Sequence, residues 1–153
     1  MMRQIALLLS LAVGLAGCGQ TQAVREGKAV NAILKLGGNV ERDEKLPGRP
    51  VVGVNLDLTK ATDSDLKDLK ELTGLKALNL WGTQITDAGL KELKELKGLQ
   101  QLYLVGTKIT DAGLKELKGL EGLQVLWLDH TQITDAGLKD LKQALPKARI
   151  HGP

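Results

Sequence analysis

An internal repeat of 24 residues dominates the chain and constrains its fold more than any other feature. Clear copies start at Leu78, Leu102 and Leu126 (102 − 78 and 126 − 102 both give 24). A fourth copy, in which several residues differ, starts one period earlier at Val54. A unit of this size buries its apolar face only against its neighbours, so the period indicates a solenoid.

The spacing of apolar residues changes within each copy. Leu78 and Leu80 alternate with other residues, which is typical of a short strand with one buried face. Leu90, Leu93 and Leu96 then recur every three residues, and a helix would place them along one inward stripe. Each copy therefore predicts a strand followed by a helix.

Residues between these segments fit the turns. Thr86 and Asp87 precede the helical stripe and can cap its first backbone N–H groups. Gly98 lets the chain turn back towards the next strand. One coil of the solenoid is thus predicted to be strand, turn, helix and turn.

The pattern L-x-x-L-x-L-x-x-T-x-I followed by T-D-x-G-L resembles the leucine-rich repeat family, and T-D-x-G-L is similar to its cysteine-containing and bacterial subclasses. The resemblance covers residues 51–145. It implies an α/β solenoid with a curved parallel sheet on the concave side and helices on the convex side, used mostly to bind proteins. It implies no catalytic residues, so we expect no enzyme activity, and we expect no cofactor or metal.

One position departs from the family pattern, because many members carry Asn or Cys where this chain has Thr. A side chain there faces the turn after the strand and must satisfy backbone groups that pair with no strand. We predict that these hydroxyls form a ladder bonded to the backbone; the alternative is that Thr simply suits strand ends. The four residues are Thr59, Thr83, Thr107 and Thr131.

Residues 1–17 read as a signal peptide rather than as part of the fold. Arg3 precedes an apolar run over residues 5–15, which is shorter than the roughly 20 residues that span a bilayer. The run ends in L-A-G-C, which resembles the lipobox of bacterial lipoproteins and implies acylation of Cys18. The alternative is an incidental cysteine, but Cys18 is the one cysteine of the chain, so no intrachain disulfide can form.

A lipid anchor implies a location in the bacterial envelope. Attachment by two or more acyl chains is lasting, whereas a single chain is marginal. Gly19 follows the cysteine, whereas Asp at that place resembles an inner-membrane retention signal of enteric bacteria, so we expect the outer membrane. Residues 18–22 would be the lipidated tether.

The remaining chain is expected to form one repeat domain with a cap. Residues 23–50 should cap the first repeat through a helix over residues 23–36 and a short strand over residues 39–43. Residues 51–153 should form the repeat domain, with Ile150 and His151 starting a fifth strand whose edge either invites self-association or is covered by the tail. The repeats are residues 54–77, 78–101, 102–125 and 126–149.

Charge gives little information about a partner. A net charge of +3 is too small to indicate nucleic-acid binding. Lysines recur at equivalent helix positions, for example at Lys91 and Lys115, with acids between them. We interpret this face as solvated, with contact to anionic lipid headgroups as the alternative.

The chain contains two Trp, one Tyr and no Phe, and all three aromatic residues fall at alternate strand positions that should point onto the concave face. Strands lie about 4.8 Å apart, so Tyr103 and Trp127 should be neighbours, and His151 should extend the row. Exposed aromatic residues are typical of interaction sites. We predict a binding surface centred on Tyr103 and Trp127, and the alternative is cross-strand pairing that only stabilises the sheet. The rim would consist of Trp81, Asn79, Gln101 and Asp129.

A protein or peptide ligand is the favoured partner. A glycan stacking on the Trp faces is a weaker alternative, and a structural role by self-assembly through the exposed edge is another. Asp129 and His130, with His151 nearby, could also form a metal or hydrolase site. Sequence drift at the edge of a loop explains that pair more simply.

Overall fold

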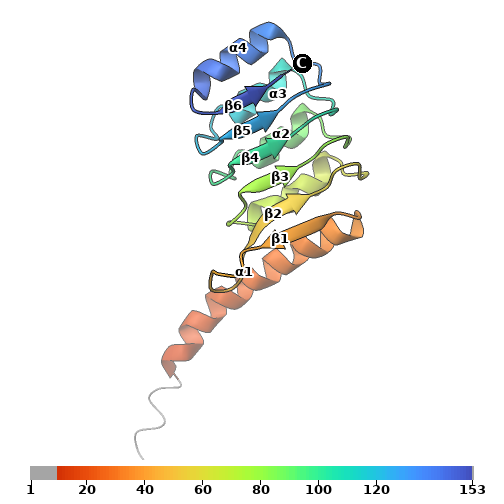
Figure 1. Cartoon of the computed structure of the whole chain (residues 1–153). Coiled ribbons are helices and arrows are strands. Elements are labelled where there is room, and N and C mark those ends of the chain that lie inside the picture. Colours follow the sequence, from red (N-terminus) through yellow and green to blue (C-terminus); the bar gives the residue numbers. More distant parts are fainter. Residues whose placement is uncertain (1–9, 153) are drawn as a thin grey trace, which may run out of the picture.

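The computed structural model describes the backbone of residues 10–152 and the side chains of residues 22–152. One six-stranded sheet runs in the order β1 to β6, and the repeat helices lie on one side of it (Figure 1). The elements are α1 (Ser10–Lys35), β1 (Asn39–Arg42), β2 (Val51–Asn55), the 3-10 helix η1 (Asp63–Glu71), β3 (Ala77–Asn79), α2 (Asp87–Leu93), β4 (Gln101–Tyr103), α3 (Asp111–Leu117), β5 (Val125–Trp127), α4 (Asp135–Ala144) and β6 (Arg149–His151).

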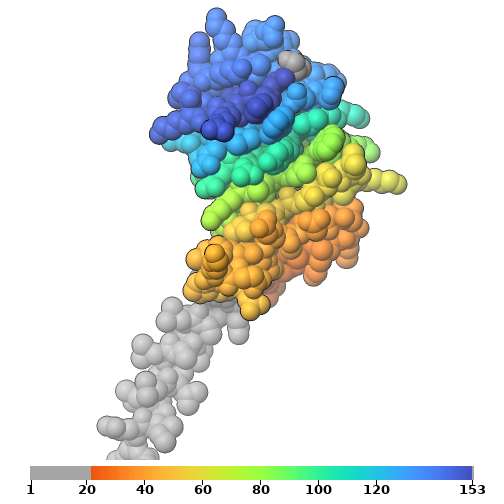
Figure 2. Space-filling view, in the orientation of Figure 1, coloured from red at the N-terminus to blue at the C-terminus, as the bar shows by residue number. Residues whose placement is uncertain are grey.

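The strand register follows the 24-residue period. Strands β2 to β6 are parallel, and Leu78, Leu102, Leu126 and Ile150 lie in one row across the sheet. The predicted α/β solenoid and its fifth repeat strand, β6, are therefore confirmed. In Figure 2 the successive segments form adjoining bands in sequence order, as expected when each coil contacts only its neighbours.

The core between sheet and helices is aliphatic. Leu78 and Leu80 from the strand side and Leu90 and Leu93 from the helix side are fully buried. Helix α2 ends at Leu93, so Leu96 lies in the turn that follows, where it is still buried. In the first copy the corresponding segment is a 3-10 helix, although its leucines have the same spacing as those of the later copies.

The threonine ladder predicted from the sequence is confirmed. Each hydroxyl donates a hydrogen bond to the carbonyl oxygen three residues earlier, at 2.6–2.7 Å. Thr83 and Thr107 are only 3% exposed, so their hydroxyls satisfy backbone carbonyls that water does not reach. The donor–acceptor pairs are Thr59–Leu56, Thr83–Leu80, Thr107–Leu104 and Thr131–Leu128.

A second ladder connects neighbouring repeats. The Thr86 hydroxyl accepts from the backbone N–H of Ala88 and so caps α2, as predicted. Asp87 was expected to cap the same helix, and this is wrong, because its carboxylate accepts from the N–H and hydroxyl of Thr110 in the next repeat at 2.8 and 2.7 Å. The same pair of bonds joins Asp63 to Thr86 and Asp111 to Thr134.

This second ladder explains the glycine of the T-D-x-G-L segment. A Cβ atom on Gly113 would collide with the carboxylate of Asp87, and Gly89 and Gly137 stand against the preceding Asp in the same way. In the first copy the glycine is replaced by Asp65, which accepts from both the N–H and the hydroxyl of Thr62. The first repeat thus supplies locally the carboxylate that the later repeats obtain from a neighbour.

The N-terminal cap has the predicted helix and strand. Gly37, with φ +86°, follows α1, and β1 pairs antiparallel with β2. Helix α1 begins at Ser10, so residues 18–22, which were predicted to be the lipidated tether, lie within this helix. Residues 1–9 of the predicted signal peptide lie outside the described part of the chain. None of the helices described has the combination of length and hydrophobicity needed to cross a bilayer.

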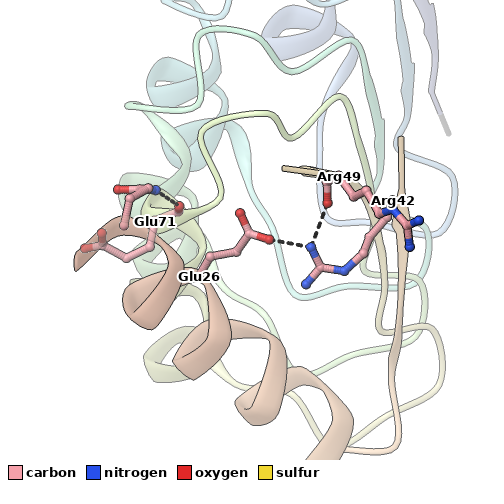
Figure 3. A network of polar contacts seen from close by, with 5 residues as sticks. Glu26, Arg42, Arg49 and Glu71 are labelled. Atoms are coloured by element: carbon pink, nitrogen blue, oxygen red, sulfur yellow. Dashed lines mark hydrogen bonds and ion pairs between the residues drawn. The ribbon is translucent and has the colours of Figure 1, made fainter. Parts of the chain in front are cut away.

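Polar contacts attach α1 to the first repeat and to β1, and attach β1 to the loop that follows it (Figure 3). The Arg42 guanidinium lies 2.6 Å from the Glu26 carboxylate and donates to the Arg49 carbonyl oxygen at 2.7 Å. The Gln22 side chain donates to the Glu71 carbonyl oxygen at 2.8 Å. These contacts hold the helix against the end of the sheet that β1 covers.

Candidate binding site on the open sheet face

The strand residues that point away from the helices form a surface that we call the open sheet face. Strand residues facing the helices, such as Leu102 and Leu126, are fully buried, whereas their neighbours along each strand are partly or well exposed. The open sheet face comprises Ala77, Asn79, Gln101, Tyr103, Val125 and Trp127, and continues past the strand ends through Trp81, Val105 and Asp129.

An aromatic row crosses this face in register. Asn79 pairs with Tyr103, Tyr103 with Trp127, and Trp127 with His151, as the sequence predicted. The Trp127 and His151 rings are stacked, with centroids 3.9 Å apart and an interplanar angle of 8°. Because His151 covers one face of the indole, the other face of Trp127 is left on the side of β4.

Next to this row lies a hollow of about 390 Å³, which we call the aromatic hollow. Its lining includes two Trp side chains and one Tyr, and Trp81 is 49% exposed. The residues that line it are Trp81, Tyr103, Val105, Trp127, Asp129 and His130. All Trp and Tyr side chains of the sequence therefore line this one hollow.

The polar part of the aromatic hollow is unusual. The Oδ2 atom of Asp129 is shielded from solvent and accepts no hydrogen bond from any described residue. His130 has φ +57°, whereas Gly82 and Gly106 occupy the same left-handed position in the two preceding repeats. This conformation costs an L-residue about 1–2 kcal/mol, so the histidine is held in a strained backbone beside the hollow.

Four of the six predicted binding residues line the aromatic hollow, namely Trp81, Tyr103, Trp127 and Asp129. The other two make local hydrogen bonds. The Asn79 Oδ1 atom accepts from the Trp81 backbone N–H at 3.1 Å, and the Gln101 Oε1 atom accepts from the Tyr103 hydroxyl at 3.2 Å. Asn79 also lines a second hollow of about 320 Å³, which shares Tyr103 with the first.

Two lining residues were not among the predicted binding residues. Val105 lies two residues after Tyr103, so strand alternation puts it on the same face and could have identified it. His130 had a different signal: it occupies the left-handed position that is glycine in the two preceding repeats.

The alternative of a metal site has a simple geometric test. Among the described residues, no group of three or more His, Cys, Asp or Glu side chains is arranged to hold a metal ion. His151, expected near Asp129 and His130, has its ring stacked on Trp127. Cys18 lies within α1, and its side chain is outside the described part of the structure.

Comparisons with known proteins give one family match and several similar solved structures. Residues 72–94 match the family model described as Leucine Rich repeat. Among solved structures, an internalin (inlF) from Listeria monocytogenes is similar, with a TM-score of 0.49 and 29% identity, over 56% of this chain and 24% of the internalin chain. A leucine-rich repeat protein from Leptospira interrogans has a TM-score of 0.45 and 29% identity, over 55% of this chain and 21% of its own.

This chain spans less than a quarter of the length of either of those structures. No curated protein matches the sequence. Proteins of this repeat fold are typically protein-binding modules and usually non-catalytic. The strand register and the family match lead to the same conclusion, and the threonine ladder and the Asp–Thr ladder repeat with the same period. The chain folds as an α/β leucine-rich repeat solenoid.

Proposed function

We propose that the protein is a non-enzymatic, membrane-anchored module that binds a protein or peptide ligand on its open sheet face, at the aromatic hollow. One observation carries the proposal: Trp81, Tyr103 and Trp127 gather around a single accessible hollow. Trp and Tyr dominate the energetics of protein interfaces, and an exposed apolar patch marks a contact site. A protein ligand also agrees with the usual role of the fold.

Stabilisation of the sheet explains only part of this arrangement. The stacked pair of Trp127 and His151 is a cross-strand contact of the stabilising kind. Trp81 follows β3, and the residues at the same repeat position in the later repeats, Val105 and Asp129, are not aromatic. Its exposure therefore supports a role in contact with a ligand.

The anchor is the second part of the proposal. Cys18 follows the L-A-G segment at the end of an apolar run, which supports acylation of this cysteine, and Gly19 in the next place supports attachment to the outer membrane. Labelled palmitate should enter the wild-type protein and not Cys18→Ser. The variant should also leave the membrane fraction, and unchanged fractionation would contradict the anchor without bearing on the binding face.

Capture of a partner tests the binding face. The full-length protein would be crosslinked in envelopes and compared with a triple variant in which Trp81, Tyr103 and Trp127 are alanine. A matched control replaces Lys91, Lys115 and Lys139 on the helix face, all of which are exposed. We expect a protein partner to be retained by the wild type and by the lysine variant and lost by the aromatic variant. Equal capture by all three would reject the open sheet face as the site.

A further inference from the structure

The aromatic hollow has a defined electrostatic character. Asp129 is the one carboxylate in its lining, and the lining contains no Lys or Arg. A shielded carboxylate oxygen without a hydrogen-bond donor is unfavourable, because it has lost water and gained no replacement. A ligand that brings a positive charge into the hollow would offset part of this cost, because it would interact favourably with the Asp129 carboxylate.

The surrounding rings favour a positively charged donor. The faces of Trp and Tyr attract cations within about 6 Å of the ring centroid, and Trp is the strongest of the aromatic residues in this respect. Trp81, Tyr103 and Trp127 surround the same space as the Asp129 carboxylate. A cation placed there would be attracted both by the aromatic faces and by the carboxylate. A neutral group would gain neither of these charge interactions.

An arginine side chain fits this combination better than a lysine side chain. The guanidinium is planar, so it stacks on an indole face while its N–H groups donate to a carboxylate in its own plane. Stacking by His151 fixes the plane of Trp127 and leaves the other indole face on the side of β4. A volume of about 390 Å³, at the small end of the range for ligand pockets, suits a single side chain.

We infer that the aromatic hollow receives an arginine side chain of the protein ligand, with Asp129 as the hydrogen-bond acceptor and the Trp and Tyr rings as stacking surfaces. This inference rests on the proposed function and specifies the chemistry of the ligand. Lysine, quaternary ammonium and apolar side chains are the competing occupants.

The chain provides its own reporter for the test. Trp81 and Trp127 are its two tryptophans, and both line the aromatic hollow, so intrinsic fluorescence reports on this place alone. The full-length protein would be titrated with acetyl-Gly-Arg-Gly-amide and with the same peptide containing citrulline, which is nearly isosteric and uncharged. We expect a saturable change with the arginine peptide, at a concentration at least tenfold lower than with the citrulline peptide.

Two variants separate the role of the carboxylate from a general effect of charge. Asp129→Asn should weaken binding of the arginine peptide at least tenfold. Asp57→Asn is the matched control, since Asp57 occupies the same register position in the first repeat, away from the aromatic hollow, and it should leave binding unchanged.

Several results would overturn the inference. Equal binding of the arginine and citrulline peptides, or no saturable change with either, would exclude a cation receptor. Equal binding of a lysine peptide would exclude the preference for guanidinium. The proposed function is tested separately: partner capture that is lost in the triple aromatic variant but unchanged in Asp129→Asn would retain the binding face and reject the arginine.

Discussion

The carboxylate of Asp87 accepts both the backbone N–H and the hydroxyl of Thr110, which is the residue that caps the helix of the next repeat. The Thr110 hydroxyl in turn accepts from the Ala112 N–H at 3.2 Å. One carboxylate therefore orients the cap of the following helix, and helix starts in successive repeats are coupled. The T-D-x-G-L segment encodes this link between repeats.

Gly113→Ala should destabilise the protein by about 1–3 kcal/mol, because its new Cβ atom would collide with the Asp87 carboxylate. Gly98→Ala is the control, since the nearest atom to its Cβ would be 3.8 Å away. The double variant Asp87→Ala/Gly113→Ala should cost less than the sum of the single changes, as expected for residues in contact. Urea unfolding compares the wild type, the two single variants, the double variant and the Gly98→Ala control, and strict additivity would contradict the proposed coupling.

Stability should fall in acid through Asp111. The hydroxyl and the backbone N–H of Thr134 donate to this carboxylate and hold its pKa below the ordinary value. A lowered pKa in the folded state means that the contribution is complete above the ordinary pKa of about 3.9 and is lost as the pH falls through the lowered value.

The comparison that tests this is wild type against Asp111→Asn, unfolded by urea between pH 7 and pH 3. The wild type should be the more stable at neutral pH, and the difference should shrink towards the acid end. A difference that stays constant over this range would show that the charge of Asp111 contributes nothing.

Most of the fold was predictable because the same pattern of apolar residues occurs in four copies of the repeat. The spacing of Leu78, Leu80, Leu90 and Leu93 identified strand and helix, and a period of 24 identified the parallel register. The ladder from Asp87 to Thr110 was missed, because a carboxylate before a helix suits capping of its own helix equally well. Only the stacking of the repeats shows that the Asp87 carboxylate binds Thr110 of the next repeat instead.

The candidate site was predictable in part, for a related reason. Alternation along strands places Tyr103 and Trp127 side by side on one face. It does not show what polar atoms do locally, and the structure adds that the predicted rim residues Asn79 and Gln101 also form hydrogen bonds with neighbouring groups. The contribution of His130 depends on its backbone conformation, which the strand pattern does not specify.

The threonine ladder predicts the effect of Thr107→Val. The hydroxyl of Thr107 donates to the Leu104 carbonyl oxygen at 2.6 Å in a buried place, and valine has nearly the same shape without the donor. We expect a loss of about 1–2 kcal/mol in the free energy of unfolding. Thr107→Ser retains the hydroxyl and should recover part of the loss, whereas unchanged stability of Thr107→Val would refute a stabilising ladder.

His130→Gly should make the protein more stable and its site weaker. Glycine adopts the left-handed conformation without strain, so the variant should gain about 1 kcal/mol, or roughly 2–4 °C in Tm. Leu58, with φ +56°, has the same strain in the first repeat and is well exposed, so Leu58→Gly should also be stabilising. Because His130 lines the aromatic hollow and Leu58 does not, only His130→Gly should weaken partner capture. Equal capture by both variants would show that the strained histidine serves no purpose in binding.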